Sequence, residues 1–220
     1  MTVQQASHSS SRYLLWWLMI AIFFEYARPG SFVSGLDVLK LNSLIPLSLV
    51  VACLFSSGLR PMKQVMRDPA AKWLLAYFCI IALSLLHANV NLALEVVRST
   101  LGYLLLAFAV ARICTTAEHV RGVFAALVVA HLFLIIMNPA TLTNPEQRNY
   151  IIGGTFLGDG NDFALSICIL LPMTIELALA SKSRFLRWFW WLSILLLAMA
   201  VIATQSRGGT LAMMAVGGAL

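Results

Sequence analysis

Arginine is the residue type in this sequence with the clearest chemical potential. Its guanidinium group presents a fixed fork of hydrogen-bond donors that fits phosphate oxygens, and it stays protonated in proteins. Several arginines that converge at one membrane surface would suit a pyrophosphate carried on a lipid. The alternative is that each arginine reaches the polar membrane surface or pairs with a nearby acid. The candidates stand at or near the ends of predicted helices: Arg28, which has Glu25 on the same helical face, and Arg98, Arg148 and Arg207.

The segment 148–164, RNYIIGGTFLGDGNDFA, places one of these arginines before a helix start. Its glycines allow tight turns and the close approach of a ligand to the backbone. Asp159, Asn161 and Asp162 stand where the next helix begins, where such side chains cap free N–H groups and the helix end favours an anion. The pattern therefore predicts either an anion site or simple capping. It has neither the ligand spacing of a calcium loop nor the ending of a P-loop.

The segment 204–210, TQSRGGT, interrupts one apolar run and precedes another. Ser206, Arg207 and the two glycines offer side-chain and backbone donors that can surround a phosphate. The alternative is a tight turn between two helices, with the arginine reaching the membrane surface.

The elements that must position these residues are membrane-spanning helices. Apolar residues make up 60% of the 220 residues and charged residues 11%, whereas a soluble domain carries roughly 25% charged residues. A chain of this composition has too little polar surface to cover a globule in water, so lipid is the expected solvent. Composition thus predicts an all-α, polytopic transmembrane bundle and argues against a soluble domain.

Seven apolar runs approach the roughly 20 residues that a helix needs to cross a bilayer. They are followed by a shorter eighth run from residue 210, which is either re-entrant or, as we prefer, the beginning of further sequence in a longer protein. Residues 1–220 then form a single transmembrane domain of about seven to eight helices, preceded by a short polar tail. The expected spans are residues 13–32, 38–57, 72–88, 96–113, 120–137, 162–181 and 186–204.

Basic residues predict the orientation of these helices. If the helices alternate, the connections 58–72 and 181–187 fall on one side, together with Arg112, Arg121 and the N-terminal tail. Because ten of the fifteen basic residues lie there, this side and the N-terminus are expected to be cytoplasmic. The longest connection, 138–161, then faces outward.

Other chemistries find less support. The net charge of +6 comes from basic residues between apolar runs, so nucleic acid is not an expected partner. The four cysteines form no CxxC or Cys/His cluster, which favours small buried apolar side chains over disulfides or a metal site. His131 lies inside a predicted helix, where hydrogen-bonded packing is expected, and no general base is assigned.

The two polar segments resemble the O-antigen ligase and polymerase family of bacterial envelope glycosyltransferases. Members carry an arginine, a GTF-type stretch and an Asn-rich helix start, matched here by Arg148, residues 154–156 and residues 161–164 (NDFA). A serine-arginine-glycine turn follows the next helix, as in residues 206–208. Residues 24–32, FEYARPGSF, also resemble the opening helix of many members, so the similarity touches most of the chain.

The resemblance implies a multi-pass protein of the bacterial inner membrane that takes a glycan from undecaprenyl pyrophosphate at the periplasmic face. The acceptor would be lipid A core, another glycan or a protein hydroxyl, and neither a cofactor nor a metal is implied. Outward arginines would stabilise the departing charge. The expected substrate contacts are Arg148 and Arg207, then Arg98, with Asn161, Asp162 and Ser206 shaping the site.

The sequence departs from the family pattern in two respects. Asp159 and Gly160 stand where many members have Asn-Pro. The large periplasmic loop with a histidine tied to catalysis has no counterpart in residues 1–220, so this stretch alone is expected to lack activity.

Two other classes stay open. A transporter or flippase for lipid-linked sugars would use the same arginines, with charges near the bilayer midplane and broken helices in paired halves. Glu176 is the only acid well inside an apolar run, and it lies near the inner end. A non-catalytic membrane protein would need none of the arginines.

Overall fold

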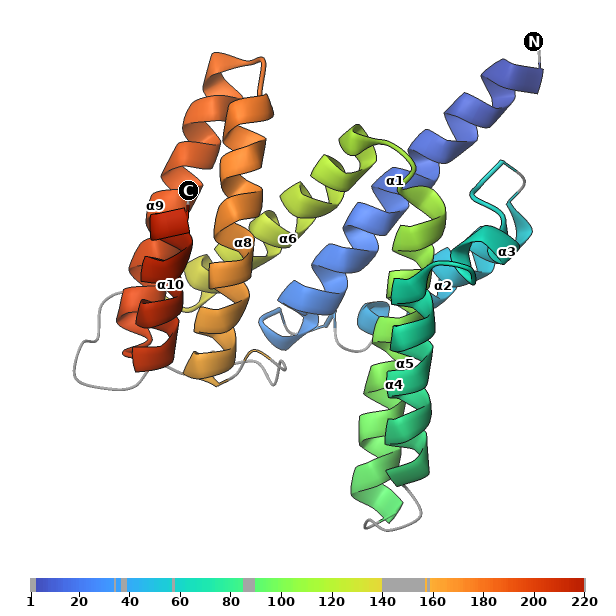
Figure 1. The fold of residues 1–220 in the computed structure, drawn as a ribbon, viewed down its shortest axis with the longest axis horizontal. Helices are drawn as coiled ribbons and strands as arrows, with labels where there is room; N and C mark the ends of the chain where they lie inside the picture. Colours follow the sequence, from blue (N-terminus) through green and yellow to red (C-terminus); the bar gives the residue numbers. More distant parts are fainter. Residues whose placement is uncertain are drawn as a thin grey trace. The chain divides into compact units, whose positions relative to one another are not determined.

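The computed structural model describes residues 3–33, 35–36, 39–56, 58–84, 90–139, 157 and 159–219. Every regular element in these residues is a helix (Figure 1). The prediction of an all-α chain is therefore confirmed for this part of the molecule. Most of the predicted outward loop, 138–161, lies outside the described residues.

The helices follow the apolar runs in order along the chain. Each predicted span overlaps a helix, and the eighth run corresponds to a helix that starts three residues earlier than expected, at Arg207. The helices are α1 (Val3–Ala27), η1 (Pro29–Ser31), α2 (Leu41–Phe55), α3 (Met62–Val65), α4 (Pro69–Ser84), α5 (Val90–Ile113), α6 (Ala117–Met137), α8 (Gly160–Ala180), α9 (Arg184–Ala203) and α10 (Arg207–Ala219).

The first helix differs most from expectation. α1 begins at Val3, inside the polar segment expected to precede the first span, and it ends at Ala27 instead of residue 32. Arg28 takes the left-handed conformation, with φ of 41°, and Pro29 has no N–H group with which to continue the helix. The turn at these two residues, and not the end of the apolar run, therefore sets the end of α1.

Among the described residues, three helices are long and apolar enough to cross a membrane: α6, α8 and α9. The apolar parts of α2, α4 and α5, residues 43–55, 69–84 and 100–113, are shorter. These features indicate an all-helical membrane protein. The total of seven to eight spans and the cytoplasmic N-terminus stay predictions.

The chain divides into two compact units. Unit 1 comprises Met1–Ala21 and Ser43–Val120, and unit 2 comprises Ile22–Asn42 and Arg121–Leu220.

In unit 1, Arg112 at the end of α5 joins three segments. Its side chain is buried, and its Nε donates to the carbonyl oxygen of Arg60 at 3.1 Å while Nη1 donates to the carbonyl oxygen of Cys53 near the end of α2. The last carbonyls of a helix lack helical partners, and a cation also complements the dipole at that end. Arg112, expected only as part of the cytoplasmic charge pattern, is therefore also a structural cap for α2.

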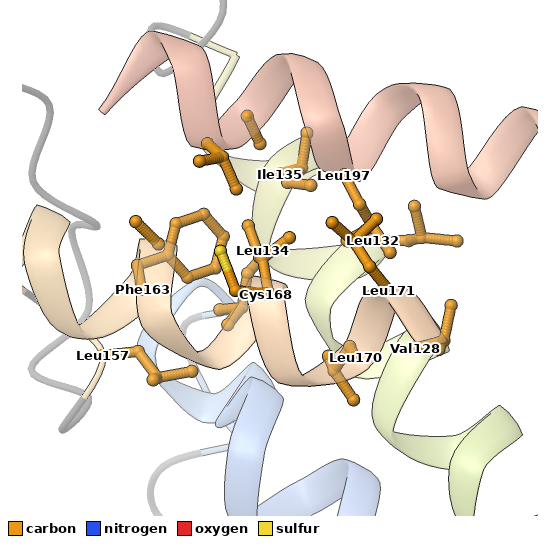
Figure 2. Close-up of a cluster of buried hydrophobic side chains, with 14 of the residues drawn as sticks. Val128, Leu132, Leu134, Ile135, Leu157, Phe163, Cys168, Leu170, Leu171 and Leu197 are labelled. Carbon is orange, nitrogen blue, oxygen red and sulfur yellow. The ribbon is translucent and has the colours of Figure 1, made fainter. Parts of the chain in front are cut away.

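In unit 2, α8 packs against both α9 and α10. Side chains from α6, α8 and α9 form the hydrophobic core, which also includes Leu157 just before α8 (Figure 2). Phe163 and Leu197 are almost completely buried within it. Lipid gives little driving force for association of apolar helices, so this close packing holds the unit together.

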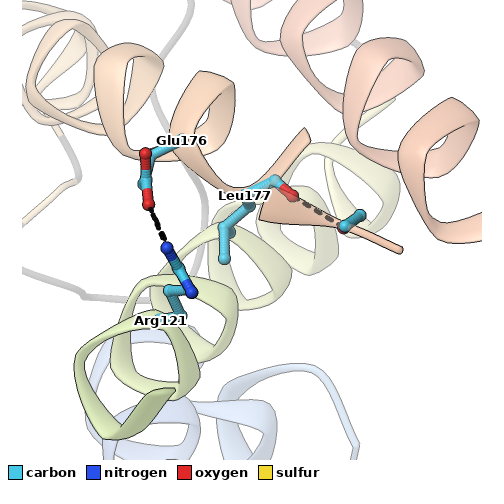
Figure 3. A network of polar contacts seen from close by, with 4 residues as sticks. Arg121, Glu176 and Leu177 are labelled. Atoms are coloured by element: carbon cyan, nitrogen blue, oxygen red, sulfur yellow. Dashed lines mark hydrogen bonds and ion pairs between the residues drawn. The ribbon is translucent and has the colours of Figure 1, made fainter. Parts of the chain in front are cut away.

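Two polar contacts join α6 to α8 in unit 2. Near the start of α6, Nη2 of Arg121 lies 2.8 Å from Oε1 of Glu176, which is near the end of α8 (Figure 3). Toward the other end of α6, Nε2 of His131 lies 3.0 Å from Oγ of Ser166, in the second turn of α8. The two helices therefore run antiparallel, as expected for consecutive spans.

Candidate functional site

The N-terminus of α8 carries three of the polar residues that the sequence singled out. Oδ1 of Asp159 accepts a 3.0 Å hydrogen bond from the backbone N–H of Asn161, so the predicted capping of this helix is confirmed, with Asp159 as the cap. Asn161 and Asp162 are exposed in the first turn. Within the described part of the chain, Asp162 forms no ion pair.

The turn between α9 and α10 is held by side chains that bond to the backbone. Thr204 Oγ1 donates to the carbonyl of Val201 at 2.7 Å and accepts from the N–H of Ser206 at 3.3 Å. Gln205 has a positive φ of 52°, and the chain reverses there. Ser206 Oγ then accepts from the N–H of Gly209 at 3.0 Å. The buried Ser206, expected to shape a substrate site, thus caps α10.

Gly209 brings the N-terminal ends of α8 and α10 together. A Cβ atom added at Gly209 would lie 2.5 Å from the Cβ of Ala164, and the Cys168 thiol donates to the Gly209 carbonyl over 3.4 Å. Both helices run in the same direction, since α9 returns the chain between them (Figure 1). Two N-termini, each the positive end of a helix dipole, therefore lie side by side.

Arg207 adds a full positive charge to this end of unit 2. It is the first residue of α10, and its side chain is exposed. No described residue forms an ion pair with it. The backbone N–H groups of the first helical turn have no helical carbonyl to bond. The Arg207 guanidinium and the two dipole ends favour an anion here, whereas the carboxylates of Asp159 and Asp162 at the start of α8 oppose one.

The other predicted contacts are not assembled with these residues. Arg148 lies outside the described residues. Arg98 is in α5, which belongs to unit 1, and only its backbone is described. Nη2 of Arg28 lies 3.9 Å from Oε1 of Glu25, an ion pair that the spacing of three residues predicted. Among the arginines proposed as substrate contacts, Arg207 alone has a described side chain.

The histidine inside α6 has a structural role. His131 is 1% exposed, and its ring is stacked on Phe163 with 5.8 Å between centroids. Its Nδ1 lies 2.9 Å from the Leu127 carbonyl, and its Nε2 bonds to Ser166. The prediction of hydrogen-bonded packing for His131 is confirmed.

The cysteines and acids give no sign of a metal or redox centre in the described residues. All four cysteines are free: Cys53 and Cys168 are buried as expected, Cys114 is half-buried and Cys79 is exposed. Burial raises the pKa of the Cys114 thiol to about 11, so this thiol stays protonated and weakly nucleophilic at neutral pH. No group of His, Cys, Asp or Glu in the described segments could hold a metal ion.

Two contacts that shape unit 2 were not predicted from the sequence. The pairing of Arg121 with Glu176 explains why an acid lies inside an apolar run, and that acid was itself a signal that a cation should lie nearby. The contact of Gly209 with Ala164 had no comparable signal, because small residues occur throughout the apolar runs.

The fold and the site define a class: an all-helical membrane protein whose unit 2 gathers positive helix ends and an arginine at one end. Comparisons with protein-family models, with curated proteins and with solved structures gave no match.

Proposed function

We propose that the chain acts as an O-antigen ligase-like glycosyltransferase of the bacterial inner membrane. It would transfer a glycan from undecaprenyl pyrophosphate to lipid A core, another glycan or a protein at the periplasmic face. In this reaction the anomeric carbon of the glycan exchanges its bond to pyrophosphate for a bond to an acceptor hydroxyl. The resemblance of residues 148–164 and 204–210 to that family supports this reaction, and the neighbouring helix ends of unit 2 would suit the pyrophosphate.

The observation that carries the proposal is the pair of neighbouring helix N-termini with Arg207 at one of them. A departing pyrophosphate gains negative charge, and donors fixed in advance stabilise that charge without reorganising. Arg207 would bind the pyrophosphate directly, while Ser206 would act by holding the N-terminus of α10 in place. Asn161 and Asp162 are exposed at the adjacent helix start, where they can contact the glycan.

The test is binding of undecaprenyl pyrophosphate to the full chain in lipid nanodiscs. Arg207→Ala should weaken binding about tenfold or more, because hydrogen bonds to charged groups contribute about 1.5–3 kcal/mol. Arg207→Lys should recover only part of the loss, since an ammonium lacks the fork of donors. The matched control is Arg67→Ala, which removes another exposed arginine, one that belongs to unit 1.

Unchanged binding by Arg207→Ala, or an equal loss in Arg67→Ala, would overturn the proposed site. Transfer is then measured with an undecaprenyl-pyrophosphate-linked glycan and an acceptor, using the complete gene product. Binding without transfer in that assay would favour the transporter of lipid-linked sugars. Absence of any binding would favour a non-catalytic membrane protein.

A further inference from the structure

A second charged surface lies at the end of unit 2 opposite the candidate pyrophosphate site. It is formed by the turn between α8 and α9 and by the first turns of α9. Arg187 Nη2 donates to the Ser181 carbonyl at 3.0 Å and so closes this turn. Lys182 and Arg184 remain exposed beside it.

The positive charge of this surface is not cancelled by acids of its own helices. Between residues 163 and 220 the sequence contains one acid, Glu176. Glu176 is already engaged, because its Oε1 accepts from both Nε and Nη2 of Arg121, at 3.0 and 2.8 Å (Figure 3). The three basic side chains of the turn therefore present their charge outward.

Large aromatic side chains lie directly beside these charges. Phe185 is 79% exposed and Trp188 is 70% exposed, and Trp191 follows on the next turn of α9. Farther along α9 the exposed side chains are purely apolar: Leu192, Leu195, Met199 and Ile202. Tryptophan prefers the boundary between lipid headgroups and acyl chains, with apolar residues below it and basic residues above. The order of side chains along α9 matches this gradient.

We infer that residues 182–191 form a binding surface for anionic phospholipid headgroups, phosphatidylglycerol being the test lipid. The basic side chains of Lys182 and Arg184 contact the headgroup phosphate, and Trp188 and Trp191 lie at the level of the glycerol backbone. A lipid fits better than a soluble anion because charges, aromatics and an apolar helix that can cross a membrane follow one another on one element. This inference does not depend on the proposed transferase function, which concerns the other end of the unit.

The test uses the full chain in phosphatidylcholine bilayers that contain either spin-labelled phosphatidylglycerol or spin-labelled phosphatidylcholine. Electron paramagnetic resonance measures the share of each lipid that is immobilised by the protein. The double variant Lys182→Gln/Arg184→Gln should lower the preference for phosphatidylglycerol by about fivefold for each basic residue removed, since a basic residue near an anionic lipid surface contributes roughly 1 kcal/mol.

The matched control is Lys63→Gln/Arg67→Gln, which removes the same two residue types from exposed positions of unit 1. It should keep most of the preference. Equal losses in both double variants would mean that overall charge attracts the lipid. An unchanged preference in Lys182→Gln/Arg184→Gln would mean that these two side chains do not bind the headgroup. Either result overturns the inference. Circular dichroism checks that both variants keep their helices.

Discussion

At the residue scale, the candidate site depends on a glycine, Gly209, which has no Cβ atom. Gly209 permits α10 to approach α8 so closely that a Cβ atom there would be 2.5 Å from the Cβ of Ala164. Small residues allow such backbone approach between membrane helices, where packing replaces the hydrophobic effect. The position of Arg207, two residues earlier, follows from this contact.

Gly209→Ala should therefore destabilise unit 2 by about 1–3 kcal/mol, the usual cost of overpacking a filled interior. The clash involves a Cβ on the neighbouring helix, so no flexible side-chain end can move aside and the helices must separate. The measurement is the unfolding midpoint of the full chain in detergent.

Two variants serve as comparisons for that measurement. Gly208→Ala adds the same methyl group where nothing lies within 4 Å, so its midpoint should stay the same or rise slightly with helix propensity. Ala164→Gly/Gly209→Ala should recover part of the lost stability, because it removes the opposing Cβ. If Gly208→Ala and Gly209→Ala behaved alike, the close contact would not exist.

At the element scale, the antiparallel pairing of α6 and α8 depends on polar contacts near both ends of their interface. His131 bonds to Ser166 at one end, and Arg121 pairs with Glu176 at the other. Apolar surfaces can slide past one another at little cost, whereas these contacts are satisfied in one register only.

Charge reversal tests the register. Arg121→Glu and Glu176→Arg should each lower stability, and the double variant should restore it. Because the two side chains are 41% and 47% exposed, the coupling should be modest, up to about 1 kcal/mol. It is measured as a double-mutant cycle of unfolding in sodium dodecyl sulfate. Additive losses in the double variant would show that the two residues do not interact.

The sequence predicted the helices well because apolar runs and their polar interruptions are local signals. The helix start after Asp159 and the break at residues 204–206 were predicted from capping and turn chemistry. The predicted end of α1 was wrong by five residues, because the left-handed conformation of Arg28 ends the helix before the apolar run does. Contacts between helices, such as those of Gly209, Arg112 and Glu176, could not be predicted, since they depend on which helices pack together.

At the scale of the molecule, the function of unit 2 depends on which end faces the cytoplasm. One end holds Lys182, Arg184 and Arg187, and the other holds the helix starts at Gly160 and Arg207. Because α8 and α9 are each long and apolar enough to cross a membrane, we expect the two ends to lie on opposite sides of it. The excess of basic residues predicts that the first end is cytoplasmic.

Cysteine labelling tests this orientation in a variant whose four native cysteines are replaced. A membrane-impermeant maleimide added to intact spheroplasts should label Asn161→Cys and Arg207→Cys, and it should label Lys182→Cys only after permeabilisation. Asn161 and Arg207 must behave alike, because the contact of Gly209 with Ala164 fixes their helix ends together. Labelling in the reverse order would put Arg207 in the cytosol, away from a glycan donor that is used at the outer face, and the transferase proposal would fail. Labelling of all three from one side would instead contradict α9 as a spanning helix.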